Sequence, residues 1–180
     1  NPHFLYNSLS LINWKAIEYG QDDISGITLA LSNYYRTSLN KGKNTLTVKQ
    51  ELSNMESYLN IQQIMHDNSF DVVMDIDENV LEYESLNLIL QPLVENAIEH
   101  GIDLLTDRRG VITVAAKLYN GLIHIEVKDN GIGMPKETAH TFLTSESGGY
   151  GARNVNDRIR LFYGEQYNLK VSSDENGTVI

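Results

Sequence analysis

The chain has 180 residues, no cysteine, and a formal net charge of −10 from 24 acidic and 14 basic residues. Such a length fits one ordinary domain or two small ones. A chain without cysteine has no disulfide, thiol nucleophile or zinc–cysteine site. The negative charge argues against direct nucleic-acid binding, because proteins that bind nucleic acids independently of sequence carry positive charge.

The charge is divided unevenly along the chain. Residues 1–66 hold five basic and five acidic residues, whereas residues 67–180 hold nine basic and nineteen acidic ones. This asymmetry predicts two parts that meet near residue 66. No stretch of the sequence approaches the roughly 20 apolar residues that span a bilayer. The chain begins at Asn1 and ends within the apolar run Thr178-Val179-Ile180, so we expect a fragment of a longer protein whose last strand is cut.

The first part is predicted to consist of three helices and no strand. The first helix covers residues 1–20, where the spacing of apolar residues is that of a coiled-coil seam. The seam residues are Leu5, Leu9, Ile12, Ala16 and Tyr19. Residues 24–40 form the second helix. Thr47 caps a third helix that ends near Met65, with Gln50 at the reciprocal capping-box position.

The second part mixes strand and helix patterns, so the fold class predicted for the chain is α+β. The dipeptides Asn120-Gly121 and Asn176-Gly177 favour tight hairpin turns between strands. Pro92 marks a kink or a late start in a helix, because proline lacks a backbone N–H. The predicted elements are strands at 70–76, 110–118, 121–128 and 167–173, helices at 84–100 and 151–163, and a loop at 134–149.

Three segments of the second part carry residues suited to chemistry. In the first, an apolar helix holds Glu95, Asn96 and His100, and the last two are four residues apart and share a face. In the second, a strand runs into the motif Asp129-Asn130-Gly131-Ile132-Gly133. The carboxylate can accept a hydrogen bond from an exocyclic amine, and glycines let the backbone approach a flat ligand.

The third segment, Gly148-Gly149-Tyr150-Gly151, opens a helix. Free backbone N–H groups at such a helix start suit phosphate oxygens. Alone, each of the three segments is also compatible with an ordinary helix face, strand end or loop. Their order and separations taken together are far more specific.

In this order the three segments resemble the N, G1 and G2 boxes of the Bergerat-type ATP-binding fold, which gyrase, MutL and histidine kinases share. The resemblance implies an α/β sandwich that binds ATP with Mg²⁺. In that family pattern Asn96 would hold the Mg²⁺ that bridges the phosphates, and Asp129 would bind the adenine amino group beside Thr178. The other implied nucleotide contacts are Gly131 and Gly133 in the adenine pocket, Gly149 and Gly151 in the phosphate lid, and His100, Asn130 and Arg153.

The first part indicates which branch of that family the chain resembles. Its start, Asn1-Pro2-His3-Phe4-Leu5-Tyr6-Asn7, is similar to the phosphoacceptor motif of LytS-type, YesM-like sensor histidine kinases. The run Tyr58-Leu59-Asn60-Ile61-Gln62 resembles a later helix of the same family. At about 100° per residue, His3 faces away from the apolar seam. This side of the helix is accessible, as a phosphoacceptor requires.

The resemblance implies a function for the whole chain. It would be the cytosolic transmitter portion of a two-component sensor kinase, with residues 1–66 for dimerisation and phosphotransfer and residues 67–180 for ATP binding. His3 would take the γ-phosphoryl group of ATP and pass it to an aspartate of a cognate response regulator. The apolar seam implies a homodimer. Any membrane contact would come through a plasma-membrane sensor region upstream of Asn1.

Three positions depart from the pattern of many histidine kinases. One is Ala152 after the last G2 glycine, where leucine is more usual. Glu99 stands where many carry a lysine that holds the terminal phosphate, so that help is expected from Arg153. Phe4 follows His3 where many carry an acid. The proton acceptor is therefore expected to be Glu95 of the N box, with a purely structural role for Glu95 as the alternative.

Three other functions remain open at this point. They are an ATPase-driven machine of the gyrase or MutL type, a serine kinase on the same fold, and a non-catalytic, ATP-responsive dimerisation module. A helical segment with a histidine motif argues against the first, and the second does not need His3. The label left by γ-labelled ATP separates them, because phosphohistidine survives alkali and is lost in acid, whereas phosphoserine behaves oppositely.

Overall fold

A hairpin of two helices, α1 (Pro2–Glu18) and α2 (Asp22–Ser38), opens the chain. The computed structural model describes residues 2–38, 44–144 and 150–180. Gly20 ends α1 with a positive φ of 64°, and its N–H and that of Gln21 bond back to the last turn of the helix, as in a glycine C-cap. Both helices agree with the prediction.

The third helix, α3 (Val48–Met65), begins with the predicted capping box. The Thr47 side chain accepts a hydrogen bond from the Gln50 N–H at 3.2 Å, and the Gln50 side chain accepts one from the Thr47 N–H at 3.0 Å. The expectation of no strand in this part is wrong. Strand β1 (Thr45–Thr47) pairs antiparallel with β3 (Glu84–Leu86), and three residues are too few to show a strand period in the sequence.

One five-stranded sheet follows, in the order β2-β4-β5-β7-β6. Strand β2 pairs parallel with β4, and the other neighbours are antiparallel. The predicted turn between β4 and β5 is confirmed, with positive φ of 50° at Asn120 and 78° at Gly121 as a type I′ turn requires. The strands are β2 (Phe70–Ile76), β4 (Gly110–Tyr119), β5 (Leu122–Asp129), β6 (Ser172–Asp174) and β7 (Gly177–Val179).

The remaining helices differ in detail from the sequence pattern. The predicted helix at 84–100 starts late, because residues 84–86 are strand β3 and Pro92 lies in the first turn of α4. The predicted loop at 134–149 contains a short helix, and the predicted strand at 167–173 is shorter and starts later. The elements are η2 (Glu78–Val80), α4 (Leu90–Asn96), the π-helical turn η3 (Ala97–Ile102), α5 (Lys136–Thr141) and α6 (Tyr150–Tyr163).

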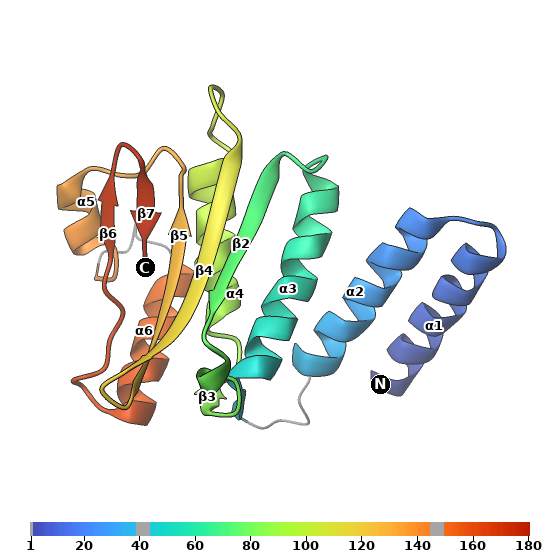
Figure 1. Cartoon of the computed structure of the whole chain (residues 1–180), viewed down its shortest axis with the longest axis horizontal. Coiled ribbons are helices and arrows are strands. Elements are labelled where there is room, and N and C mark those ends of the chain that lie inside the picture. The colour runs from blue at the N-terminus through green and yellow to red at the C-terminus, as the bar shows by residue number, and fades with distance from the viewer. Residues whose placement is uncertain (1, 39–43, 145–149) are drawn as a thin grey trace.

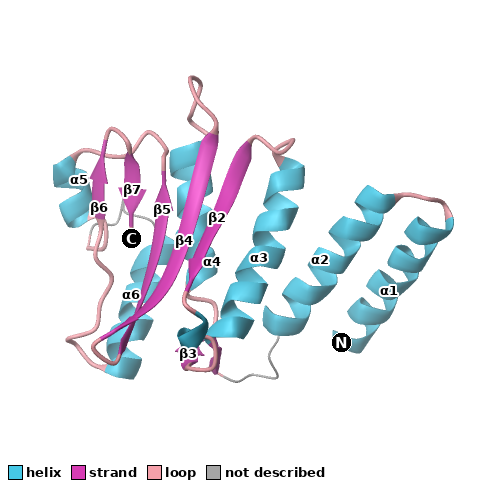
Figure 2. Cartoon of the chain, in the orientation of Figure 1, coloured by secondary structure: helices cyan, strands magenta, loops and turns pink. Residues whose placement is uncertain are grey.

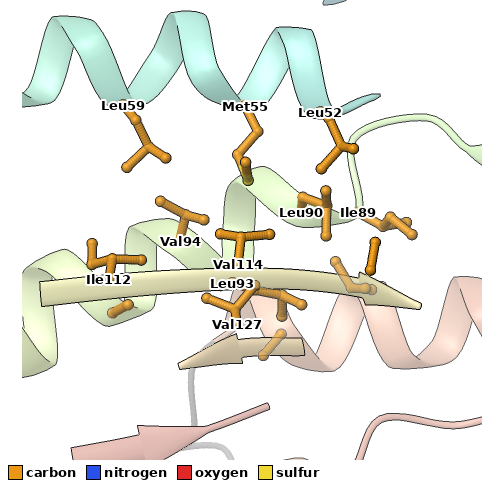
Figure 3. Close-up of a cluster of buried hydrophobic side chains, with 14 of the residues drawn as sticks. Leu52, Met55, Leu59, Ile89, Leu90, Leu93, Val94, Ile112, Val114 and Val127 are labelled. Atoms are coloured by element: carbon orange, nitrogen blue, oxygen red, sulfur yellow. The ribbon is translucent and has the colours of Figure 1, made fainter. Parts of the chain in front are cut away.

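The core of the sheet is shared by strands and helices. Figure 3 shows side chains of α3 pointing toward those of α4 and of strands β4 and β5. Val94, Ile112 and Val114 in this cluster are fully buried. Helix α3 therefore packs as part of the α/β unit, although it precedes residue 66, and the predicted boundary there stays a prediction.

Figure 2 shows the strands gathered at one end of the molecule and the hairpin of α1 and α2 at the other. Helix α2 packs against both α1 and α3. The predicted fold class is confirmed: a helical segment is followed by an α/β sheet domain. Within the described residues, no helix has the length and apolar character to cross a membrane.

Candidate functional site

Asp129 is the last residue of β5 and lies on the inward face of that strand. Its neighbours on this face, Ile123, Ile125 and Val127, pack into the core, which follows from the period of two in a strand. Asp129 is 5% exposed. Burial raises the pKa of its carboxyl, and hydrogen bonds from the Gly131 and Thr178 N–H groups oppose that rise.

The carboxylate of Asp129 is held by its backbone neighbours. Oδ1 accepts the N–H of Gly131 at 2.7 Å and that of Thr178 at 3.4 Å. Among the described residues, these are the two bonds from other residues to the Asp129 side chain, and both end on Oδ1. The second oxygen, Oδ2, is then the acceptor that remains for an exocyclic amine of a ligand.

Glycines let three backbone segments meet at Asp129. A Cβ added to Gly131 would lie 2.3 Å from the Gly101 Cα atom, and one added to Gly101 would lie 2.8 Å from Oδ1 of Asp129. Gly133 has a φ of 64°, and a Cβ there would lie 1.6 Å from the Asp174 carbonyl oxygen. The end of η3 is therefore packed directly onto the G1 loop, which only glycine permits. The sequence analysis missed Gly101, although its place next to His100 in the N box was visible.

Two hydroxyl groups support the same corner from the sheet edge. Ser173 Oγ lies 2.9 Å from Thr178 Oγ1 and donates to the Gly177 carbonyl oxygen at 3.0 Å. It also accepts the N–H of Met134 in the G1 loop at 2.8 Å. Thr178 lies beside Asp129, as expected. Ser173 was missed, because only the pairing of β6 with β7 brings it opposite Thr178.

Asn130 anchors the G1 loop to the start of β4. Its Oδ1 accepts the Val111 N–H at 2.7 Å, and its Nδ2 donates to the Arg109 carbonyl oxygen at 3.1 Å. Arg108 donates to the carbonyl oxygens of Asn130 and Gly131, each at 3.0 Å. Both side chains thus fix the loop backbone, and direct contact of Asn130 with a nucleotide stays a prediction.

Asn96 ends helix α4, where the π-helical turn begins. Such turns are rare and occur often at functional sites. The Asn96 Nδ2 atom is buried and has no hydrogen-bond partner among the described residues. A side-chain amide offers both a donor and an acceptor, and its oxygen is a hard ligand of the kind that Mg²⁺ prefers. The unpartnered atom is the donor Nδ2, whereas the oxygen would be the ligand, so the role of Asn96 as a metal ligand stays a prediction.

The other N-box residues differ in exposure. Glu95 is half-buried, and its Oε1 accepts a hydrogen bond from Gln91 Nε2 at 2.6 Å. His100 and Glu99 are exposed. Glu95 is thus oriented by the preceding turn of its own helix and is followed by Asn96 in the chain.

The G2 segment is described only in part, because Gly149 lies outside the described residues. Gly151 is in the first turn of α6, and a Cβ there would lie 3.0 Å from the Pro92 Cβ atom. The glycine therefore lets α6 approach α4 closely. The Arg153 guanidinium lies 5.7 Å from the centre of the Tyr150 ring, a cation–π distance.

His3 lies apart from these residues. It is exposed on α1, as the helix geometry predicts, and its Nδ1 is 3.3 Å from Asn7 Nδ2. Figure 1 shows α2 and α3 between α1 and the sheet. The structure therefore brings Asp129, Gly131, Gly133 and Thr178 together but leaves His3 outside this group.

Comparisons with known proteins place the chain in a family. A histidine kinase model matches residues 1–70, and a model of the histidine kinase-, DNA gyrase B- and HSP90-like ATPases matches residues 82–180. The chain belongs to the sensor histidine kinase family. The sensor histidine kinase YesM of Bacillus subtilis is 37% identical over 182 residues, and the sensor protein LytS of Staphylococcus saprophyticus is 33% identical over 186 residues. Both alignments cover 100% of this chain but only 31% of the relative, so this histidine kinase chain spans about a third of their length.

Solved histidine kinases share the fold. The histidine kinase domain of the blue-light activated kinase from Erythrobacter litoralis EL346 has a TM-score of 0.56 at 18% identity, covering 98% of this chain and 92% of that one. The histidine kinase ThkA, in complex with the response regulator protein TrrA, has a TM-score of 0.56 at 16% identity, covering 99% of this chain and 56% of that one. The arrangement of helices on the sheet is thus that of histidine kinases.

Proposed function

We propose that the chain is the transmitter portion of a sensor histidine kinase, which moves the γ-phosphoryl group of ATP to His3 and then to an aspartate of a response regulator. The observation that carries the proposal is the corner at Asp129. At this corner, backbone segments that contain glycine come close to a buried carboxylate. One oxygen of this carboxylate accepts hydrogen bonds from backbone N–H groups. This arrangement suits the amino group and flat ring of adenine.

The nucleotide would extend from this corner toward α4 and the start of α6. Asp129 would accept the adenine amino group, with Thr178, Gly131 and Gly133 shaping the pocket. Asn96 would hold Mg²⁺, which neutralises charge on the phosphates. Arg153 and the glycines at 149 and 151 would meet the phosphate oxygens, and His100 and Asn130 would border the site.

Transfer to His3 requires an arrangement that differs from the present one. Helices α2 and α3 separate α1 from the sheet, so the hairpin must dock elsewhere on the α/β unit or come from a second chain. An imidazole nitrogen of His3 then attacks the γ-phosphorus, and the bond from that phosphorus to the ADP oxygen breaks. The proton on the other ring nitrogen would pass to a base, for which Glu95 is our candidate.

The hairpin supplies the proposed homodimer contact. It exposes large apolar side chains, with Leu11, Ile17 and Tyr19 each at least 60% exposed. An apolar groove between the helices is lined by Leu11, Ile12, Lys15, Ala16, Tyr19, Gln21 and Ile24. Exposed patches of this kind mark interaction sites, and a second hairpin would cover it.

The remaining partners are proposed from the relatives. The complex of ThkA with TrrA supports a response regulator as the acceptor of the phosphoryl group. The relatives that match are sensor proteins about three times as long as this chain. We therefore expect the parent protein to carry a sensor region in the plasma membrane, with this portion in the cytoplasm.

The test is the chemistry of the label after incubation with γ-labelled ATP and Mg²⁺. The proposal predicts a label that survives alkali and is lost in acid. An acid-stable label would indicate a serine kinase, ATP hydrolysis without label would indicate an ATPase machine, and binding without either would indicate a non-catalytic module. Asn96→Ala should remove the tightening of ATP binding by Mg²⁺, and equal tightening in variant and parent would exclude Asn96 as the ligand.

A further inference from the structure

The side-chain carboxyl group of Glu51 on α3 is buried. Glu51 is 2% exposed. Its Oε1 accepts the N–H groups of Ile89 at 2.7 Å and Leu90 at 2.9 Å, and its Oε2 accepts that of Leu88 at 2.9 Å. Burying a charge is costly unless it is hydrogen-bonded, so three converging donors indicate a built contact.

The donors belong to the start of helix α4. The first N–H groups of a helix have no partner inside it, and the residue before α4, Ile89, makes no side-chain cap of its own. Leu88 has a φ of 55°, a left-handed conformation that is unusual for leucine and persists only where its surroundings hold it. Glu51 therefore caps α4 from another helix and holds a strained residue in place.

Arg158 of α6 binds the carbonyl groups of the same segment. Its guanidinium donates to the Leu88 carbonyl oxygen at 3.2 Å and to that of Asn87. The segment 87–90 is thus held through its N–H groups by α3 and through its C=O groups by α6. We call these two side chains, Glu51 and Arg158, the α4 clamp.

The clamp joins the elements that carry the phosphate side of the proposed site. Helix α4 runs from the clamp to Glu95 and Asn96, about 8 Å away at 1.5 Å per residue. Helix α6 carries Gly151, where an added Cβ would lie 3.0 Å from the Pro92 Cβ atom of α4. The adenine corner, by contrast, is built from β5, β7 and the G1 loop, and the clamp bonds to none of these in the described chain.

We propose that Glu51 and Arg158 are positioning residues, which set the Glu95 and Asn96 side chains relative to the phosphates of a bound nucleotide. The inference rests on the proposed nucleotide site. Removing one clamp contact lets the start of α4 shift, and a rigid helix carries that shift to its other end. Adenine binding at Asp129 stays, whereas the geometry at the phosphates is lost.

Glu51→Gln is the first test, because its amide places a donor where the carboxylate accepted three N–H groups. The matched control is Glu56→Gln, an exposed residue on the same helix. Calorimetric titration with ADP, with and without Mg²⁺, separates the two sides of the site. We expect the tightening by Mg²⁺ to fall at least fivefold in Glu51→Gln and not in Glu56→Gln, while ADP affinity without Mg²⁺ changes less than twofold.

Arg158→Gln, with Arg160→Gln as its control on α6, gives the same test if Glu51→Gln does not fold. In the clamp variants, the rate of single-turnover labelling of His3 at saturating Mg-ATP should fall by about 10–100-fold, since misplacement of reacting groups by about 1 Å lowers rates by that order. Unchanged tightening by Mg²⁺ in a folded clamp variant would overturn the inference, as would equal losses with and without Mg²⁺. If the parent chain binds nucleotide but gives no phosphohistidine, the kinase proposal fails, and the binding comparison still decides the role of the clamp.

Discussion

The large cluster of buried apolar residues lies in the α/β unit and includes none from the hairpin of α1 and α2. In the hairpin, Phe4 is 73% exposed and Trp14 is 57% exposed, whereas Phe70 and Val94 of the α/β unit are fully buried. The α/β unit packs its core against the sheet, although Leu161 of α6 is 85% exposed. The hairpin leaves apolar surface uncovered, as expected of a segment that works against other molecules. Under the proposed function, the region with the buried core would bind the nucleotide, and the hairpin with the exposed apolar surface would accept the phosphoryl group.

Glu95→Gln should slow phosphoryl transfer from the α/β unit to His3 of the hairpin, and this is the largest expected effect. Loss of a general base slows proton transfer by about 10²–10⁴-fold, while ATP affinity in the α/β unit stays nearly unchanged. Single-turnover labelling of His3 at saturating ATP measures the rate. A normal rate, or a loss explained wholly by weaker ATP binding, would leave Glu95 with only a structural role.

A pair of leucine-to-alanine changes compares the regions directly. Leu90 is 1% exposed in the α/β unit, and Leu11 is 60% exposed on the hairpin. Leu90→Ala should lower the free energy of unfolding by about 2–5 kcal/mol, whereas Leu11→Ala should change it by less than about 0.5 kcal/mol in the monomer. Urea unfolding followed by circular dichroism at low protein concentration gives both values. Equal losses would contradict the contrast between the regions.

Asp129→Asn tests whether ATP affinity depends on the inward face of β5 in the α/β unit. Losing a hydrogen bond to a charged group costs about 1.5–3 kcal/mol, so ATP affinity should fall about 10–150-fold while the variant stays folded. Glu126→Gln, on the exposed face of the same strand, is the matched control. Calorimetric titration decides the matter: ATP affinity equal to that of the parent would remove Asp129 from the site.

The pH dependence of nucleotide binding is the smallest effect. Burial raises the pKa of Asp129 above its ordinary value of 3.8, so the carboxylate becomes protonated at a higher pH than an exposed aspartate. Only the ionised form gives the adenine amine a charged acceptor, and affinity should therefore fall as the pH drops through this raised pKa. The ratio of ADP affinity in the parent to that in Asp129→Asn should fall toward low pH, because only the parent loses a charged acceptor. Titration of the phosphates affects both proteins alike and cancels in this ratio. A constant ratio would contradict this role.

Local sequence patterns predicted most of the fold. The capping box at Thr47 and Gln50 and the turn at Asn120-Gly121 depend only on neighbouring residues, and both are confirmed. The pairing of β1 with β3 could not be predicted, because it joins three-residue strands about 40 residues apart. A short strand has no period of its own to reveal it.

The site shows the same limit. The family resemblance named Asp129 and Thr178 together, and the Thr178 N–H does donate to Asp129 Oδ1 at 3.4 Å. Gly101, Ser173 and Glu51 were missed because each contacts a segment far away in the sequence. Gly101 and Ser173 contact the G1 loop, and Glu51 contacts the start of α4. Their roles depend on contacts that only the folded chain brings together.

The central claim is that a nucleotide held by the α/β unit phosphorylates a histidine of the hairpin. Peptide mapping after incubation with γ-labelled ATP and Mg²⁺ tests it most directly, with His3→Gln as the matched variant. The account predicts one acid-labile label in the peptide that contains His3, and loss of that label in His3→Gln with ATP affinity intact. An acid-labile label that persists in His3→Gln, or that maps to the α/β unit, would contradict it.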